Sequence, residues 1–172
     1  MEPVAGNPDI FVEGLTMSAA LEGPDYWLRE MLAGDLDAVA IIEKKSYGFP
    51  WSRRVLRDCL RANYICRVLE SDDALLGYGI MSCGAAEGHI LNICVDPSSR
   101  TKGLGTMLIS SLLENARLIG VKLIYLEVRP SNLSAVKLYK SLEFEQVATR
   151  VDYYPTPSGR EDALVFSKAL ND

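Results

Sequence analysis

The spacing of apolar and polar residues predicts strands over much of the chain from residue 26 onward. Some stretches alternate with a period of two, and others are short continuous apolar runs between turn-forming residues. Both patterns are typical of strands. The predicted strands are Tyr26–Met31, Ile65–Leu69, Leu75–Cys83, His89–Val95, Lys122–Val128, about Phe144–Tyr153 and Ala163–Lys168.

Apolar residues at helical spacing predict helices in four intervals between these strands. The first helix begins near Asp35 and ends before Phe49-Pro50, and the second is capped by Ser52. The third carries the longest apolar stripe, from Leu104 to Ala116, and ends at Gly120. The fourth is capped by Ser131 or Asn132. The order β-α-α-β-β-β-α-β-α-β-β predicts a mixed α/β sheet.

The 172 residues fit one domain, since domains commonly span roughly 100–200 residues. Residues 1–25 contain several glycines and prolines and no sustained periodicity, so they are predicted to form an N-terminal extension, mobile and outside the core. The domain proper is then 26–172. We find no internal repeat.

The charge pattern excludes some classes of partner. The net charge is −5 and no basic cluster is present, which argues against direct nucleic-acid binding. No apolar run reaches the roughly 18 residues of a membrane span, and the N-terminus lacks a secretory signal, so we expect a cytoplasmic protein without a membrane partner. Mild acidity fits a basic protein or peptide partner, although solubility alone explains it equally well.

The cysteines and the single histidine limit the possible chemistry. Cys59, Cys66, Cys83 and Cys94 form no C-x-x-C pair, and one histidine, His89, cannot complete a Cys/His metal site, so no metal is expected. The cysteines lie among apolar residues and are predicted to be buried, reduced thiols. A lone histidine also argues against Ser-His-Asp or Cys-His catalysis. Any general acid or base is therefore expected to be a Glu, Asp, Tyr or Lys side chain.

The segment between the strand ending at Val95 and the helix opening near Gly103 is typical of an anion site. Glycines allow the backbone to turn so that successive N–H groups point at one anion, and the helix N-terminus adds partial positive charge. Arg100 and Lys102 flank this turn. The segment is not a P-loop, because no Lys follows Gly105, and it is not a dinucleotide fingerprint, because Leu108 replaces the third glycine. A glycine-rich turn without any ligand is the remaining alternative.

Several segments carry a resemblance to a known family. Arg100-x-x-Gly103-x-Gly105 resembles the Q/R-x-x-G-x-G/A signature of the GNAT acetyltransferases, and the element order over about residues 26–170 matches their fold. Within that superfamily the chain resembles the bacterial ribosomal-protein-alanine N-acetyltransferases, the RimI group. The matching segments are Phe49–Ser52, Asn92–Pro97, Leu126–Asn132, Ala135–Tyr139, and Tyr153–Pro155 followed by Gly159–Ala163.

The resemblance implies a GNAT fold, with a twisted, mostly antiparallel mixed sheet of about seven strands flanked by about four helices. It also implies acetyl-CoA as the co-substrate. The backbone of Ile93, Cys94 and Val95 would pair with the pantetheine arm, and the Val95 N–H region would polarise the thioester carbonyl. The residues that would hold the pyrophosphate are Arg100, Thr101, Lys102, Gly103, Leu104, Gly105 and Thr106. Asn132 would hydrogen-bond the cofactor, cap a helix, or do both.

Two residues match the catalytic positions of the family. Glu127 matches the general base, which an α-amine with a pKa of about 7.7–8.0 needs before it can attack. The alternative is an exposed strand glutamate. Tyr139 matches the general acid that would protonate the leaving thiolate, and its alternative is a core tyrosine on the apolar helix face. Both descriptions of Tyr139 can hold together.

The resemblance implies acetylation of a protein N-terminus, with the N-terminal alanine of a small-subunit ribosomal protein as the named acceptor. Trp51 and Tyr154 are candidates for lining the peptide groove, with core packing or loop anchoring as the alternative for each. The other hypotheses are acetylation of a different N-terminus, a lysine or a small amine, and a CoA-binding regulatory module without turnover.

The chain departs from the family in three places. Glu143 stands where the family usually has a glycine after a helix, which predicts strain or a different cap there. Ser99 replaces a frequent aromatic residue, and the N-terminal extension is longer than the family core requires.

Overall fold

The computed structural model describes residues 25–72 and 74–170, so the predicted extension at 1–25 lies, except for Asp25, outside the described residues. The strands are β1 (Trp27–Glu30), β2 (Ile65–Glu70), β3 (Leu75–Gly84), β4 (Glu87–Val95), β5 (Leu123–Val128), β6 (Glu145–Thr156) and β7 (Gly159–Ala169). The helices are α1 (Leu36–Ser46), α2 (Arg53–Arg61), α3 (Leu104–Leu118) and α4 (Leu133–Ser141). Short 3-10 turns, η1 (Ala33–Asp35) and η2 (Pro97–Ser99), precede α1 and follow β4. The predicted order of strands and helices is confirmed.

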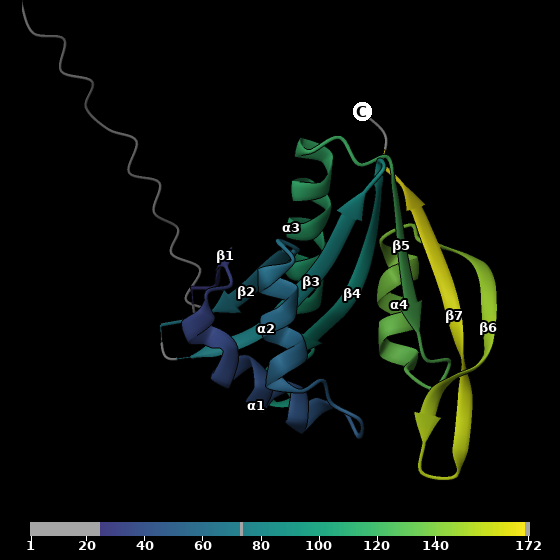
Figure 1. Ribbon diagram of the computed structural model, residues 1–172, viewed down its shortest axis with the longest axis horizontal. Coiled ribbons are helices and arrows are strands. Elements are labelled where there is room, and N and C mark those ends of the chain that lie inside the picture. The colour runs from purple at the N-terminus through teal and green to yellow at the C-terminus, as the bar shows by residue number, and fades with distance from the viewer. Residues whose placement is uncertain (1–24, 73, 171–172) are drawn as a thin grey trace, which may run out of the picture.

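The strands form one seven-stranded sheet in the order β1-β2-β3-β4-β5-β7-β6, with helices on both faces (Figure 1). The alternation along β3 explains the two layers. Tyr78 and Ile80 are buried beneath α1 and α2. Gly77 and Gly79 face α3, where an added Cβ would come within 3.1 Å of Leu108 and 3.0 Å of Leu112. These glycines therefore allow α3 to lie close against the sheet.

A β-bulge in β4 changes which side chains face each helix layer. Ile80 pairs with Asn92 and Met81 pairs with Ile90, so Leu91 is an extra residue without a partner in β3. An extra residue shifts the alternation of all residues that follow it. Asn92 consequently faces α1, whereas Ile93 packs against the cores on the α3 side.

Strands β4 and β5 are parallel neighbours over only part of their length. The paired residues are Glu87–Ile90 with Leu123–Leu126, and beyond them the two strands diverge (Figure 1). The segment of β4 after Ile90 therefore keeps β3 as its neighbour on one edge and has an open edge on the other.

The last hairpin is longer than predicted. Strand β6 runs to Thr156 and β7 begins at Gly159, so Pro155 lies within a strand and not in a loop. Proline lacks an N–H and is tolerated here because β6 is an edge strand.

The sequence also predicted a buried Cys83, but this thiol is exposed near the end of β3, while Cys59, Cys66 and Cys94 are buried.

Glu143, at the end of α4, adopts a backbone conformation that is strained for a residue other than glycine. Glu143 has a φ of +62°, the left-handed conformation that glycine favours. The Phe144 N–H donates to the Tyr139 carbonyl at 3.0 Å, and the Glu143 N–H donates to the Lys140 carbonyl at 3.0 Å. These two bonds form a Schellman cap. The predicted strain is present, and the cap itself is the usual one.

Within the described part of the chain, no helix is both long and apolar enough to cross a membrane.

Candidate active site

The open edge of β4 presents two residues whose main chain has no strand partner. The Asp96 N–H donates to the Leu76 carbonyl of β3 at 2.7 Å. Because main-chain groups of successive residues alternate between the two edges, those of Ile93 and Val95 point away from β3. Two side chains support this orientation: the Tyr47 hydroxyl donates to the Ile93 carbonyl at 2.9 Å, and Arg100 Nε donates to the Val95 carbonyl at 3.2 Å. Cys94, between them, pairs with Tyr78 and buries its side chain.

The turn after β4 is held by Asp96. Its carboxylate accepts from the Ser98 N–H at 3.0 Å, from Ser98 Oγ at 2.6 Å and from Lys45 Nζ at 3.2 Å. These hydrogen bonds lower the pKa of Asp96, with Ser98 as the main cause. The carboxylate is consequently ionised at neutral pH and fixes the start of the turn.

The predicted pyrophosphate loop leads directly into the N-terminus of α3. Thr101 and Gly103 both have positive φ, +65° and +76°, and Gly103 is the N-cap of α3. A glycine N-cap offers no side-chain acceptor, so the first N–H groups of the helix remain available to an anion. Thr101 and Lys102 are exposed, Leu104 is buried, and Gly105 and Thr106 are half-buried. The loop geometry therefore fits a diphosphate.

Gly105 also allows α3 and α4 to approach each other. An added Cβ would lie 3.0 Å from Leu138 Cδ2 on α4. Asn132 caps the same helix: its Oδ1 accepts from the Ala135 N–H at 3.2 Å and from Ser134 Oγ at 3.1 Å. Its Nδ2 has no hydrogen-bond partner in the described chain, so the cap leaves a donor for a ligand.

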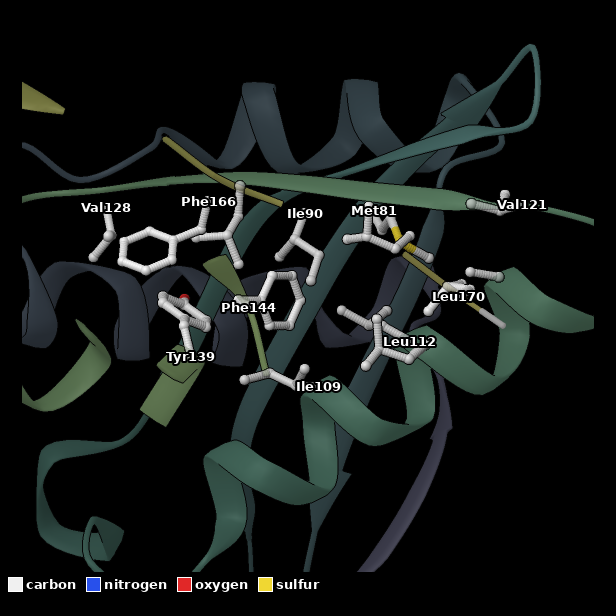
Figure 2. Close-up of a cluster of buried hydrophobic side chains, with 14 residues drawn as sticks. Met81, Ile90, Ile109, Leu112, Val121, Val128, Tyr139, Phe144, Phe166 and Leu170 are labelled. Atoms are coloured by element: carbon white, nitrogen blue, oxygen red, sulfur yellow. The ribbon is translucent and has the colours of Figure 1, made fainter. Parts of the chain in front are cut away.

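Tyr139 projects from α4 into the core. Its ring lies 5.9 Å from that of Phe144 and 6.4 Å from that of Phe166, measured between centroids. Figure 2 shows it at one end of the buried cluster, beside Phe144. Burial raises the pKa of Tyr139 to about 12, and no described residue hydrogen-bonds its hydroxyl. Tyr139 is thus a core tyrosine with an available, protonated hydroxyl.

Glu127 lies on the opposite face of the sheet from α3 and α4. Its neighbours Leu126 and Val128 are buried in the core, whereas the Glu127 side chain is 14% exposed. Its carboxylate contacts Arg150 of β6, with Oε1 and Nη2 3.2 Å apart. The guanidinium of Arg150 also lies 5.5 Å from the ring centre of Tyr153. A half-buried carboxylate is therefore held by a cation from a neighbouring hairpin.

Tyr139 interacts electrostatically with Tyr154 and with Tyr47, and Tyr154 also interacts with Glu127. Burial raises the pKa of Tyr154 well above its usual value, and Glu127 and Tyr139 are further causes. Burial likewise raises the pKa of Tyr47, with Cys94 and Tyr139 among the further causes. Tyr139 on α4 thus contributes to the raised pKa of tyrosines from two other elements, the α1–α2 loop and β6.

The two predicted groove residues lie in different surroundings. Tyr154 is half-buried, and Arg129 stacks on its ring with the guanidinium carbon 4.4 Å from the centroid. Arg129 is itself fixed by Glu161 at 2.8 Å. Trp51 packs against the core beneath α1 and α2, while Phe49, in the same loop, is 50% exposed.

The sequence did not predict Tyr47 or Arg150 as site residues. Tyr47 reaches the Ile93 carbonyl and Arg150 reaches Glu127 across many residues of sequence, so no local pattern marks them. A hydroxyl next to the Phe49–Ser52 segment was the only signal for Tyr47.

Comparisons with known proteins identify the family of this chain. Residues 36–144 match the family described as the Acetyltransferase (GNAT) family. The chain is 37% identical over 137 residues to the [ribosomal protein bS18]-alanine N-acetyltransferase of Salmonella typhimurium, covering 80% of this chain and 93% of the relative.

Solved structures show the same fold. The ribosomal-protein-S18-alanine N-acetyltransferase of Escherichia coli superposes with a TM-score of 0.80 at 32% identity, covering 84% of this chain and 94% of that one. The acetyltransferase yncA of Salmonella typhimurium, solved with acetyl-CoA, has a TM-score of 0.74 at 18% identity, covering 86% and 95%.

Proposed function

Because the chain belongs to the acetyltransferase (GNAT) family and is an acetyl-CoA-dependent N-acetyltransferase, we propose that its acceptor is the N-terminal α-amine of a protein. The specific acceptor that we propose is the N-terminal alanine of a small-subunit ribosomal protein. The observation that carries the proposal is the half-buried Glu127 together with the buried Tyr139, which interacts electrostatically with Tyr47, the residue bonded to the open edge of β4. The relative from Salmonella typhimurium, named for acetylating such an alanine, supports it.

Acetyl-CoA fits the residues along this edge. The N–H groups of Ile93 and Val95 would bond the pantetheine arm and the thioester carbonyl, as an added strand would. The loop from Arg100 to Thr106 would bind the pyrophosphate through main-chain N–H groups. Asn132 would donate its free amide group to the cofactor. The thioester supplies an activated acetyl group, and the remaining chemistry belongs to the side chains.

Glu127 would act as the general base. The acceptor amine must lose its proton before its lone pair can attack the thioester carbon, and Glu127 would take that proton directly or through a water. A cationic amine approaching Glu127 must compete with Arg150, which already lies 3.2 Å from the carboxylate. The acceptor amine would thus replace one cation by another before transferring its proton.

Tyr139 would act as the general acid. As the new C–N bond forms and the C–S bond breaks, the phenol would donate its proton to the departing sulfur. Burial keeps this hydroxyl protonated well above neutral pH, because it raises the pKa of Tyr139 to about 12. The nitrogen loses two protons on the way from ammonium to amide. Glu127 would take the first and release it to solvent. The second, lost after the C–N bond forms, would pass through solvent to restore the proton that Tyr139 gives to the thiolate.

The test is incubation with acetyl-CoA and peptides that differ at the first residue, read by mass fragmentation. We expect acetylation on the α-amine of peptides that begin with alanine. Acetylation confined to lysine side chains or to small amines would overturn the acceptor assignment and leave the transferase assignment intact. Binding of acetyl-CoA without turnover on any amine would instead favour a regulatory module.

A further inference from the structure

Glu43 is a buried carboxylate that the proposed chemistry does not use. It lies on α1, its side chain belongs to a residue that is only 1% exposed, and no described cation forms a salt bridge with it. A buried carboxylate is costly unless hydrogen bonds compensate for the lost water. Its Oε1 accepts from the Trp51 main-chain N–H at 2.8 Å. Its Oε2 accepts from the Tyr78 hydroxyl and from Asn92 Nδ2, the latter at 3.3 Å.

These three donors connect Glu43 to two strands of the sheet and to the loop between α1 and α2. Tyr78 belongs to β3, and Asn92 belongs to β4 immediately after the bulge at Leu91. The bulge turns the Asn92 side chain toward α1, where it meets Glu43. Trp51 belongs to the loop between α1 and α2, so one carboxylate joins this loop to the strand that has the open edge.

The ends of the loop pack the side chains of Tyr47 and Trp51 on the core, whereas its middle has few attachments. Gly48, Phe49 and Pro50 are exposed, and Pro50 has no N–H to donate. The Tyr47 hydroxyl is fixed on the Ile93 carbonyl at one end of the loop, and the Trp51 N–H is fixed on Glu43 at the other. Loss of either contact would free one end of this loop, whose first residue is bonded to the open edge of β4.

We propose that Glu43 is a positioning residue that fixes the Tyr47–Ser52 loop against β4 and thereby shapes the acceptor side of the active site; this rests on the proposed function. Asp96 performs the corresponding task on the cofactor side, where it fixes the turn that leads to the pyrophosphate loop. A carboxylate suits this role because it accepts several hydrogen bonds at once, and bonds to a charged acceptor are about twice as strong as neutral ones.

The test is Glu43→Gln in the full chain. The amide preserves side-chain volume but removes the charge and brings an NH₂ group toward the donors. We expect KM for the acceptor peptide to rise about tenfold, as follows from loss of a charge-assisted hydrogen bond. The affinity for acetyl-CoA, measured by calorimetry, and kcat at saturating acceptor should change less than about twofold.

A second measurement needs no acceptor. Hydrogen exchange should accelerate across Gly48–Ser52 in Glu43→Gln and remain unchanged in α3 and β5. If the wild-type chain acetylates some other amine, the proposed function fails, but the exchange result still tests the loop, and the KM change is then measured with that amine. Tyr78→Phe removes one donor, retains the carboxylate, and should shift KM and exchange in the same direction by a smaller factor.

The matched control is Glu70→Gln, which also converts a hydrogen-bonded carboxylate to an amide. Glu70 pairs with Arg29 at 2.8 Å between β2 and β1, away from the site, so its loss should leave the acceptor KM unchanged. Unchanged KM and exchange in folded Glu43→Gln would overturn the proposal. An equal loss of cofactor and acceptor affinity would also overturn it, because that pattern belongs to a residue that only stabilises the fold.

Discussion

At the scale of single residues, the hydroxyl of Tyr139 is the group most directly testable. Tyr139→Phe keeps the ring that packs on Phe144 and removes only the proton donor. We expect kcat to fall about 10²- to 10⁴-fold, with little change in acetyl-CoA affinity. Steady-state kinetics and calorimetry measure the two effects. A variant that retains wild-type kcat would exclude Tyr139 as the acid.

The raised pKa of Tyr139 also predicts a pH profile. Burial raises this pKa from 10.0 to about 12. The phenol therefore keeps its proton as the pH rises and loses it only when the pH approaches about 12. The wild-type kcat should therefore show no decline that depends on Tyr139 between about pH 8 and pH 10. A fall in kcat near pH 10 that disappears in Tyr139→Phe would contradict the raised pKa of Tyr139, although it would keep Tyr139 as the acid.

The proposed role of Glu127 leads to a different prediction, because Glu127 would take a proton from the acceptor amine, whereas Tyr139 would give one to the leaving thiolate. Glu127→Gln should lower kcat/KM by about 10²- to 10⁴-fold near neutral pH. The deficit should shrink as the pH passes about 7.7–8.0, where the α-amine loses its proton without help. A deficit that is constant across pH would indicate a structural contribution and not general-base catalysis.

The sequence suggested roles for Glu127 and Tyr139 but could not predict the long-range contacts around the site. Alternation with Leu126 and Val128 left open whether Glu127 is an exposed strand glutamate, and its proposed role came from the resemblance. The Arg150–Glu127 and Glu43–Asn92 contacts each join residues that are far apart in sequence, so no local periodicity predicts them. The contact between Asn92 and Glu43 depends further on the bulge at Leu91, which reverses the alternation that the sequence alone would predict.

At the scale of elements, the turn into α3 depends on Gly103 more cleanly than on Gly105. Gly103 has a φ of +76°, and an added Cβ would meet nothing within 4 Å. Gly103→Ala therefore tests backbone conformation alone. We expect about a tenfold loss of acetyl-CoA affinity and a loss of about 1 kcal/mol in the free energy of unfolding. Calorimetry and denaturant unfolding measure both, and unchanged affinity would exclude this turn as the pyrophosphate site.

Gly105→Val combines two effects. The added side chain would block backbone approach to the pyrophosphate, and it would also press on Leu138 of α4, the helix that carries Tyr139. We expect weaker acetyl-CoA binding together with a lower kcat for the cofactor that does bind. Wild-type affinity in a folded Gly105→Val variant would contradict the assignment of this loop.

The cap of α4 provides a prediction about stability. Glu143 occupies a left-handed position that glycine adopts without strain, and α3 ends in the same kind of cap with Gly120 at φ +81°. Glu143→Gly should raise Tm by about 2–4 °C, although it removes an exposed ion pair with Lys168. Glu143→Gln is the control, since it loses the ion pair and keeps the strain. A lower Tm for Glu143→Gly than for Glu143→Gln would refute this account.

The sequence predicted the regular helices and strands, but it did not predict where a strand contains an unfavourable residue such as proline. The stripe from Leu104 to Ala116 predicted α3 because all its apolar residues pack on one face. Pro155 suggested a loop, but an edge strand accommodates a residue without an N–H. The edge position of β6 follows from the strand order, which is a property of the whole sheet and not of residues near Pro155.

At the scale of the whole molecule, the divergence of β4 and β5 separates the side where we propose that the cofactor binds from the side where we propose that the acceptor binds. The N-terminus of α3 and the open edge of β4 form the proposed cofactor side. The α1–α2 loop and the β6–β7 hairpin bring Tyr47, Arg150 and Tyr154 to the proposed acceptor side. Glu127 and Tyr139 lie on opposite faces of the sheet, so base and acid approach the diverging strands from opposite directions.

The last prediction concerns charge over the whole chain. The net charge is −5, and ribosomal proteins are basic, so the field of the enzyme should attract such an acceptor before contact. Salt shortens the range of that field to about 10 Å at 0.1 M, which should slow association and leave the chemical step unchanged. We therefore expect kcat/KM for a peptide that begins with alanine and continues with basic residues to fall as salt increases. A matched peptide with neutral residues after the alanine should show a nearly flat response, because it lacks the charge on which the field acts. Equal salt dependence for the two peptides would place the effect on the enzyme or on acetyl-CoA binding, and would remove charge as a reason for preferring a ribosomal acceptor.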